Sequence, residues 1–560
     1  MDRLAKLSCL IALLFVPIAG CDNGGSSERE ADGGGAGDAD TDADTDTDTD
    51  TDSETDTDSE MKSFPYPLKV DDVEWFPCSL HEGEDDGLAE CAETPMPFYW
   101  NDSSNETMNI YAKRLLASGE ATTQLWLLQG GPGASGVIMF PKLMELFREY
   151  MPDVDLYTID HRGTGYSSRL GCPEQEAEES ASGRSVDMSE IDACFAHMDA
   201  TLGDWENGVT ATYSAIDVGA YIHLTREEDK KIIVWGGSYG SYWAHRYLQV
   251  FPDQADGVSI AGIAPPNATF LTFDEGADDG AQLFMKVCGE DDFCSSMLGD
   301  DPWAKLVEVM DSLKGGHCPD LPFSFDSIRN LFAYVLYYYP HYSVVPAVVY
   351  RLNRCEPGDI DAVTALWDAT FGEGGTWDIE SYSILLQHHI TFSEMWEHPD
   401  YVGVDAMEQY LADVYDSTYV AKSGGMPKLG YYQIWPAYED PQYDDQWATT
   451  ATPMLMLQGK LDPATSWANA IPLRDHFNGA NQVFVTFEYA PHSVFFATPL
   501  SRGEEPEHCA MNLFLNFVDD PKSELDLTCV DQTLPPDFKG TPELAEALLG
   551  TTDFWEDDTP

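Results

Sequence analysis

Short apolar runs, separated by glycine-rich or polar turns, recur along most of this chain. Each run is four to eight residues long and rich in β-branched or aromatic side chains, a pattern that predicts a buried strand. The segment 241–248 contains no helix breaker, and 327–337 has a similar helical character. Strands separated by such segments predict a parallel sheet; the strand candidates are residues 124–129, 154–159, 230–235, 257–263, 453–459 and 482–487.

One strand runs into a helix through a turn with a serine between glycines. The sequence VWGGSYGS places Ser238 directly after the strand candidate 230–235 and before the helix candidate 241–248. In such a turn the glycines remove the Cβ atoms that would collide with neighbouring backbone, and the serine side chain becomes exposed at the edge of the sheet. The motif therefore indicates a nucleophile, although a glycine-rich turn with an incidental serine fits this stretch as well.

Two later strands carry polar residues that complete the pattern. Asp462 follows the strand candidate 453–459, and His492 follows 482–487. Parallel strands end at one edge of a sheet, where α/β proteins place their sites. The chain order Ser238, Asp462, His492 is the order of an α/β-hydrolase triad. We therefore expect His492 to act as general base for Ser238 and Asp462 to orient it.

Two glycine-rich loops follow upstream strands. GGPGASG begins at Gly130 and DHRGTGYSS at Asp160. Glycines before a proline leave backbone N–H groups free to hold an oxyanion. We expect Gly131 and Tyr239, the residue after the serine, to form the oxyanion hole.

Taken together, these motifs resemble the serine exopeptidases of the proline iminopeptidase and tripeptidyl aminopeptidase type, within the α/β hydrolases. The resemblance covers about residues 63–535 and includes a late cysteine pair, Cys509 and Cys529. Gln129 stands where prolyl enzymes usually carry a histidine, which favours the tripeptidyl branch, and DPATSW replaces the commoner D-P-x-T-P. The resemblance implies a mostly parallel sheet flanked by helices, with a large helical cap inserted before the strand of Asp462. In the family the cap binds the substrate's free amino terminus with acidic groups, for which Glu394 is the first candidate here and Glu397 the second.

The amino-terminal region indicates export. Residues 1–21 combine a charged start, a short apolar run and the sequence IAGC, which looks like a bacterial lipobox ending at Cys21. Residues 22–62 are rich in Asp, Thr, Gly and Ser and predict an extended spacer. We expect a cell-envelope lipoprotein, periplasmic or at the cell surface, in contact with the membrane through its lipid; a plain secretory signal is the alternative.

The charge and cysteine content narrow the function further. The chain has 99 Asp and Glu against 29 Lys and Arg, a formal charge of −70, which excludes nucleic acid as a partner. Ten cysteines remain after Cys9 and Cys21, which suggests five disulfides in an exported chain. Their connectivity is open; pairing of sequence neighbours gives Cys78–Cys91, Cys172–Cys194, Cys288–Cys294, Cys318–Cys355 and Cys509–Cys529. We expect neither metal nor cofactor, and His388–His389 to be cap packing or surface residues.

The sequence as a whole predicts an exported serine aminopeptidase that releases amino-terminal residues or short peptides from peptide substrates. An esterase or lactonase of the same fold, or an inactive hydrolase-fold binding module, remains open, as do the number of residues removed per cut, the membrane and the oligomeric state. The expected division is signal 1–21, spacer 22–62, hydrolase core 63–266 and 448–535, helical cap 267–447 and acidic tail 536–560.

Overall fold

The computed structural model describes residues 64–556 except 83–85, 102–104, 184, 338–340, 372–378, 423 and 504–505. The predicted signal, spacer and Cys21 lie outside the described residues. The described chain folds around a nine-stranded sheet of order β1-β2-β3-β5-β4-β6-β7-β8-β9. Its strands are β1 (Phe76–Cys78), β2 (Ala89–Pro97), β3 (Thr107–Leu115), β4 (Thr123–Leu128), β5 (Val154–Ile159), β6 (Lys231–Gly237), β7 (Gly257–Ala261), β8 (Met454–Gly459) and β9 (Gln482–Phe487).

All six strands predicted from the apolar runs form, and they are neighbours in the sheet. β5, β4, β6, β7, β8 and β9 are parallel to one another, whereas β1 and β3 run in the opposite direction. Because the parallel strands end at one edge, the loops after β4, β6, β7, β8 and β9 come together there. This is the α/β-hydrolase fold that the motifs predict.

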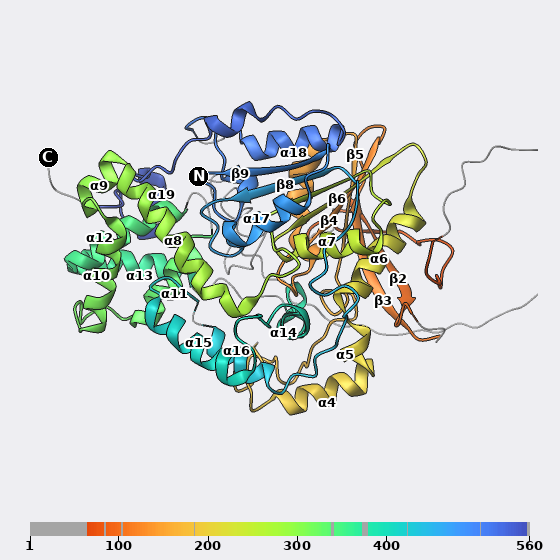
Figure 1. The fold of residues 1–560 in the computed structure, drawn as a ribbon, viewed down its shortest axis with the longest axis horizontal. Helices are drawn as coiled ribbons and strands as arrows, with labels where there is room; N and C mark the ends of the chain where they lie inside the picture. The colour runs from red at the N-terminus through yellow and green to blue at the C-terminus, as the bar shows by residue number, and fades with distance from the viewer. Residues whose placement is uncertain are drawn as a thin grey trace, which may run out of the picture.

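Helices cover both faces of the sheet (Figure 1). On β4, Leu125 and Leu127 pack with α3 (Pro141–Tyr150) and α18 (Cys509–Asp519). The alternate residues Trp126 and Leu128 belong to an apolar cluster that includes residues of α6 (Ala211–Thr225), α7 (Tyr239–Val250) and α17 (Trp467–His476). A strand buried on both faces is continuously apolar, which is why the strands were recognisable as short apolar runs. The other described helices before α6 are α2 (Gly136–Met139), α4 (Ile191–Leu202) and α5 (Trp205–Gly208).

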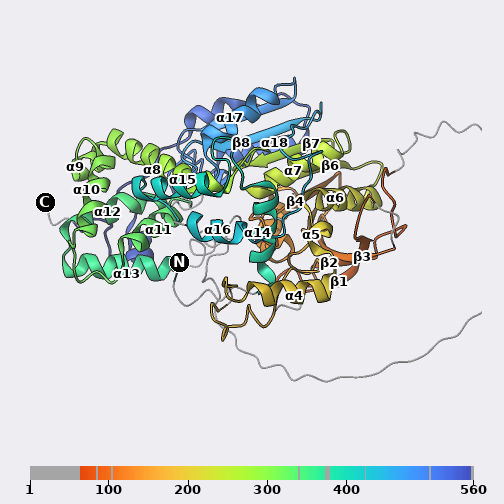
Figure 2. The same ribbon diagram turned by 60° about the horizontal axis from the view of Figure 1, so that its bottom comes forward.

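The long insertion between β7 and β8 is helical, as expected of the cap. In Figures 1 and 2 the helices α9–α13 lie farthest from the sheet, and α14 lies next to it. The distal helices have an apolar cluster of their own. The inserted helices are α8 (Phe273–Glu290), α9 (Asp292–Leu298), α10 (Pro302–Lys314), α11 (Phe325–Val335), α12 (Val345–Arg354), α13 (Pro357–Phe371), α14 (Ile384–Glu394), α15 (Val404–Ser417) and α16 (Gly425–Tyr432).

The C-terminal segment differs from the expected acidic tail. It forms α19 (Pro542–Leu549), which packs against α13, and Phe554 and Trp555 are buried in the apolar cluster of the cap. Arg351 on α12 donates from Nε to the carbonyl oxygen of Phe554 at 2.6 Å. The sequence interpretation missed these buried apolar side chains because acidic residues dominate the segment.

The ten cysteines form the five neighbouring pairs, Cys78–Cys91, Cys172–Cys194, Cys288–Cys294, Cys318–Cys355 and Cys509–Cys529. Two of these disulfides, Cys288–Cys294 and Cys318–Cys355, lie within the cap. Among the described residues, no helix combines the length and apolar character needed to cross a bilayer.

Removal of the Trp555 side chain tests the role of the C-terminal segment. Trp555 is 2% exposed and donates from Nε1 to the carbonyl oxygen of Phe538 at 2.8 Å. We expect Trp555→Ala to lower the free energy of unfolding of the cap by about 3–5 kcal/mol, because the change leaves a cavity and an unpaired carbonyl. Urea denaturation followed by tryptophan fluorescence measures this. Tyr150→Ala, at a side chain that is 57% exposed, is the control; equal small effects of both changes would show that the segment does not stabilise the cap.

Candidate active site

The turn between β6 and α7 holds Ser238 in a backbone conformation that few side chains adopt. Ser238 has φ 56° and ψ −129°. A Cβ on Gly236 would lie 2.0 Å from the carbonyl oxygen of Gly240, and a Cβ on Gly240 would lie 2.1 Å from that of Leu128. Glycine is therefore the residue that fits at both positions. The serine precedes the first turn of α7, at the carboxyl edge of the sheet.

His492 and Asp462 meet at the same edge. His492 donates from Nδ1 to Asp462 Oδ2 at 2.8 Å, and both side chains are buried. With Nδ1 protonated, Nε2 is the nitrogen left to accept a proton. The structure thus joins two residues that the sequence separates by thirty positions.

Asp462 is held by a set of donors that the sequence analysis did not identify. Its Oδ1 accepts the backbone N–H groups of Ala464 at 2.8 Å and Thr465 at 2.9 Å. Its Oδ2 accepts from Thr465 Oγ1 at 2.7 Å and from Gln458 Nε2 at 3.1 Å. Because these bonds fix both carboxylate oxygens, the imidazole can hydrogen-bond to Asp462 in one orientation. The signal for Thr465 was present in DPATSW, where the threonine of the commoner motif is kept.

Two neighbours confine the ring of His492. Gly262, at φ 56°, approaches so closely that a Cβ there would lie 2.9 Å from His492 Cε1. On another side, the ring of Tyr337 meets the imidazole edge-on, with 5.8 Å between ring centres. Gly262 comes from the loop after β7 and Tyr337 from the cap, so both the core and the cap position this ring.

The loop DHRGTGYSS braces the loop GGPGASG. Asp160 Oδ1 accepts from Ser135 Oγ at 2.7 Å and from the backbone N–H of Val137 at 3.1 Å. Burial raises the pKa of Asp160 to about 6, although these hydrogen bonds oppose the shift. Thr164 donates from Oγ1 to the carbonyl oxygen of Gly133 at 2.5 Å. These contacts hold the backbone around Gly131 against the turn of Ser238.

His161 and Arg162 are structural residues beside this turn. His161 Nδ1 donates to the carbonyl oxygen of Arg162 at 2.8 Å, and its Nε2 accepts from the Tyr239 hydroxyl at 3.1 Å. Burial lowers the pKa of His161 to about 4, so the ring is neutral near pH 7. Arg162 forms two hydrogen bonds with the Asp217 carboxylate, at 2.5 and 2.7 Å. Both residues thus brace the fold around the site.

A cavity of about 420 Å³ opens at this edge of the sheet. Its volume lies in the range of small-molecule and cofactor sites. Its lining includes Gly131, Ser238, Tyr239 and His492 from the core. The remaining wall comes mainly from the cap, with the charged residues Asp274, Lys422 and Lys428. The structure therefore gathers the expected nucleophile, base and oxyanion-hole residues around one cavity, with Asp462 directly behind the base.

The two glutamates expected to bind a substrate amine lie elsewhere. The carboxylate of Glu394 is buried and pairs with Arg246 on α7, with 3.0 Å between Oε2 and Nη2, and Tyr242 donates its hydroxyl to the same oxygen at 2.7 Å. Glu397 is exposed and accepts from the Tyr432 hydroxyl at 2.7 Å. Neither residue lines the cavity. Sequence position does not reveal the ion pair between Glu394 and Arg246, so the amine-binding role stays a prediction.

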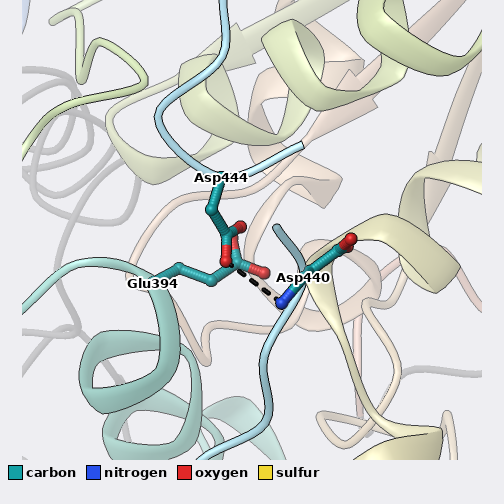
Figure 3. Close-up of side chains that lie close together, drawn as sticks. All are labelled: Glu394, Asp440 and Asp444. Carbon is teal, nitrogen blue, oxygen red and sulfur yellow. Dashed lines mark hydrogen bonds between the residues drawn. The ribbon is translucent and has the colours of Figure 1, made fainter. Parts of the chain in front are cut away.

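Glu394, Asp440 and Asp444 form the one group of potential metal ligands among the described residues. Figure 3 shows the carboxylates of Glu394 and Asp444 side by side and that of Asp440 farther from them, with one oxygen of each residue within 4.8 Å of the others; the Asp440 backbone N–H donates to Asp444. Arg246 lies against all three carboxylates, at 2.9 Å from Asp444 and 3.5 Å from Asp440. Its guanidinium supplies the cation of this cluster, which links α7 to the cap.

His388 and His389 are packing residues, in line with the sequence interpretation. Burial lowers the pKa of each to about 3, so both are neutral. His389 accepts from Trp435 Nε1 through Nδ1 at 3.1 Å, and its Nε2 lies 3.1 Å from the carbonyl oxygen of Glu206. Both ring nitrogens of His389 are therefore engaged within the protein.

Comparisons with known proteins match both halves of the site. A family model described as alpha/beta hydrolase fold matches residues 125–296, which include Ser238, and one described as TAP-like protein matches 431–526, which include Asp462 and His492. The serine protease Hip1 of Mycobacterium tuberculosis is 24% identical over 261 residues, which are 43% of this chain and 49% of that protein. The protein of that name from Mycobacterium bovis matches equally. The chain thus spans about half the length of these curated relatives.

Two solved structures are similar at low TM-scores. Candida antarctica lipase A in its closed state has a TM-score of 0.33 and 10% identity, over 84% of this chain and 86% of that one. The proline iminopeptidase of Mycobacterium smegmatis has a TM-score of 0.32 and 12% identity, over 77% and 98%.

A methyl group on Gly262 tests the placement of His492. We expect Gly262→Ala to lower kcat for an activated aryl ester about 100-fold, since the added Cβ displaces the imidazole and a small misplacement of a reacting group has a cost of this size. The control is Gly299→Ala, where φ is +89° but nothing lies within 4 Å of the added Cβ. Similar rates for the two variants would show that the contact with His492 does not matter.

A second substitution separates the structural role of Glu394 from amine binding. We expect Glu394→Gln to lower the free energy of unfolding by about 3 kcal/mol, because it weakens a buried ion pair, and to leave KM for a peptide with a free amino terminus within twofold. Glu397→Gln, at the exposed neighbour, is the control and changes stability by less than about 0.5 kcal/mol. A tenfold rise in KM with unchanged stability would restore Glu394 as the amine-binding group.

Proposed function

We propose that this hydrolase of the α/β-hydrolase fold is a serine peptidase that removes amino-terminal residues or short peptides through an acyl-enzyme. The observation that carries the proposal is the hydrogen bond from His492 Nδ1 to Asp462 Oδ2, 2.8 Å long, beside the cavity that Ser238 lines. This arrangement supplies a nucleophile, a base and an orienting carboxylate from three separate loops.

The chemistry follows from the ordinary properties of these groups. A serine hydroxyl is a weak nucleophile at neutral pH, so His492 Nε2 accepts its proton as Ser238 Oγ attacks the scissile carbonyl. Asp462 stabilises the imidazolium that forms and keeps the proton on Nδ1. His492 then protonates the leaving amine, and water hydrolyses the acyl-enzyme by the same route in reverse.

The oxyanion of the tetrahedral intermediate needs donors on the opposite side of the carbonyl. We assign this role to the backbone N–H groups of Tyr239 and Gly131, which line the cavity beside Ser238. In other enzymes, loss of one such donor costs about 3–4 kcal/mol of transition-state stabilisation. The contacts of Asp160 with Ser135 and Val137 position the loop of Gly131 before substrate arrives.

Peptides are the favoured substrates because of the similar proteins. The TAP-like match covers the segment of Asp462 and His492, and the curated relatives carry the name serine protease. Since Glu394 and Glu397 do not line the cavity, Asp274 is the described carboxylate available there for a substrate's amino terminus. The same absence favours ester hydrolysis as the second candidate, because the triad alone serves both bonds.

We further propose that the protein is exported and anchored at the cell envelope by a lipid on Cys21. The five disulfides support export, because disulfides persist in oxidising compartments. The leader and the acidic spacer 22–62 supply the anchor and the distance from the membrane in this proposal.

Substitution of the nucleophile tests the proposal. We expect the full chain to hydrolyse a fluorogenic tripeptide with a free amino terminus, and Ser238→Ala to lower kcat at least about 10⁴-fold because the acyl-enzyme can no longer form. Ser118→Ala, at an exposed serine, retains full activity as the control. Release of the fluorophore is the measurement.

Two further substrates distinguish the alternatives. An N-acetylated form of the tripeptide reports whether a free amino terminus is required, and a short-chain aryl ester reports ester hydrolysis. Ester turnover without peptide turnover would replace the peptidase with an esterase. Silence on all three substrates would leave a hydrolase-fold binding module.

A further inference from the structure

Two lysines line the cavity of Ser238 in a chain that is otherwise strongly acidic. Lysine and arginine number 29 against 99 aspartates and glutamates, yet among the described residues the charged members of the cavity lining are Lys422, Lys428 and Asp274, apart from His492 if protonated. Lys422 follows α15, Lys428 lies on α16 and Asp274 lies on α8. The described cap residues that line this cavity thus carry a net positive charge, whereas the chain as a whole is strongly negative.

Neither lysine has a carboxylate partner in the part of the chain that the structure describes. Among the residues that the structure describes, the ammonium groups of Lys422 and Lys428 form no ion pair and no hydrogen bond; Lys422 Nζ lies over the rings of Tyr337 and Tyr334, at 4.1 and 4.2 Å from their centres. Lys428 Nζ lies 4.9 Å from the ring centre of Phe270. Lysines elsewhere on the chain do pair with acids; examples are Lys230, Lys305 and Lys460. Two unpaired ammonium groups in one cavity therefore indicate a site for an anion.

The charged wall is adjacent to the candidate base. The ring of Tyr337 contacts Lys422 on one side and the imidazole of His492 on another. Asp274 does not neutralise the lysines by direct pairing, since its Oδ1 accepts the backbone N–H of Lys422 at 2.9 Å. An anionic group held by the lysines would therefore lie close to the bond under attack at Ser238.

We propose that Lys422 and Lys428 select substrates that carry a carboxylate near the scissile bond. This inference rests on the proposed function, because it names the substrate class of the same cavity. The carboxylate has two sources in peptides, the side chain of an acidic residue and the free C-terminus of a short peptide. The lysines are specificity residues, and bond cleavage remains with Ser238 and His492.

The pKa of Lys422 depends on the burial of its ammonium group and on its charged neighbours. Burial lowers the pKa of Lys422 to about 7, repulsion from Lys428 adds to the shift, and Asp274 opposes it. Burial also lowers the pKa of Lys428. The groups around Lys422 are Asp274 on α8, Tyr334 on α11, Tyr337 and Lys428, none of which fully compensates its charge. Since the anion needs the charged form of lysine, we expect its affinity to fall as the pH rises above 7.

Binding of three short peptides to the full chain carrying Ser238→Ala, which cannot form the acyl-enzyme, tests the proposal without turnover. The ligands are a tripeptide amide ending in Glu, the same amide ending in Gln, and the Gln tripeptide with a free C-terminal carboxylate. Isothermal titration calorimetry at pH 6.5 measures each Kd. We expect at least one carboxylate ligand to bind about tenfold or more tightly than the neutral amide, because a charge-assisted contact has this value. The tighter ligand identifies the source of the carboxylate.

Substitution of both lysines provides the matched comparison. We expect K422M combined with K428M to abolish the preference for the carboxylate ligands and to leave Kd for the neutral amide within threefold. K286M, at a lysine of α8 that does not line the cavity, retains the preference. Circular dichroism and Tm measure whether the double variant is folded. If it is unstable, the single changes K422R and K428R provide the second test, and we expect both to retain the preference because they keep the charge.

The outcomes separate this inference from the peptidase assignment. Equal affinity of all three ligands for the Ser238→Ala chain with both lysines present, or an unchanged preference after both lysines are replaced in that chain, would overturn the anion site even if the wild-type enzyme cleaves neutral peptides. A lysine-dependent preference in a protein without peptidase activity would keep the anion site and refute the peptidase.

Discussion

The backbone at Ser238 is the constraint on which the rest of this site depends. A non-glycine residue at φ 56° costs about 1 kcal/mol or more and persists only where its surroundings enforce it. Here the enforcement comes from close backbone contacts at Gly236 and Gly240, which reach the next turn and the end of β4. The strained turn places Ser238 beside the loop of Gly131. Asp160 positions the loop of Gly131 beside Ser238, and Thr465 helps to hold Asp462, which orients His492.

The core and the cap contribute different parts of the cavity. The core carries Ser238, Asp462 and His492 on loops at one edge of the sheet, and its parallel strands hold these loops in register. The cap supplies much of the cavity wall, including Lys422, Lys428 and Tyr337. Arg246 connects the two parts, because it lies on the helix of Ser238 and binds Glu394 on α14 and Asp444 before β8. The ion pairs of this cluster therefore connect the cap to the helix that follows Ser238.

Much of the fold was predictable because its strands are buried on both faces and read as short apolar runs. The Ser238, Asp462 and His492 candidates were identifiable for a similar local reason, since each directly follows such a strand. The role of Glu394 was not, because its partner Arg246 is 148 residues away and a chain with 99 acidic residues offers no means of choosing among them. Lys422, Lys428 and Thr465 were not identified for the same reason, because their contacts at the cavity are with residues that are distant in the sequence or are visible only in the fold. The C-terminal anchors Phe554 and Trp555 were masked by their acidic surroundings.

Covalent labelling tests whether Ser238 is a nucleophile activated by His492. The full chain would be treated with a fluorophosphonate, which phosphonylates activated serines, and the modified peptide would be identified by mass spectrometry. We expect a single adduct, on Ser238, that forms at least about 100-fold more slowly in His492→Ala because the general base is lost. An adduct on another serine, or labelling of Ser238 at an unchanged rate without His492, would contradict it.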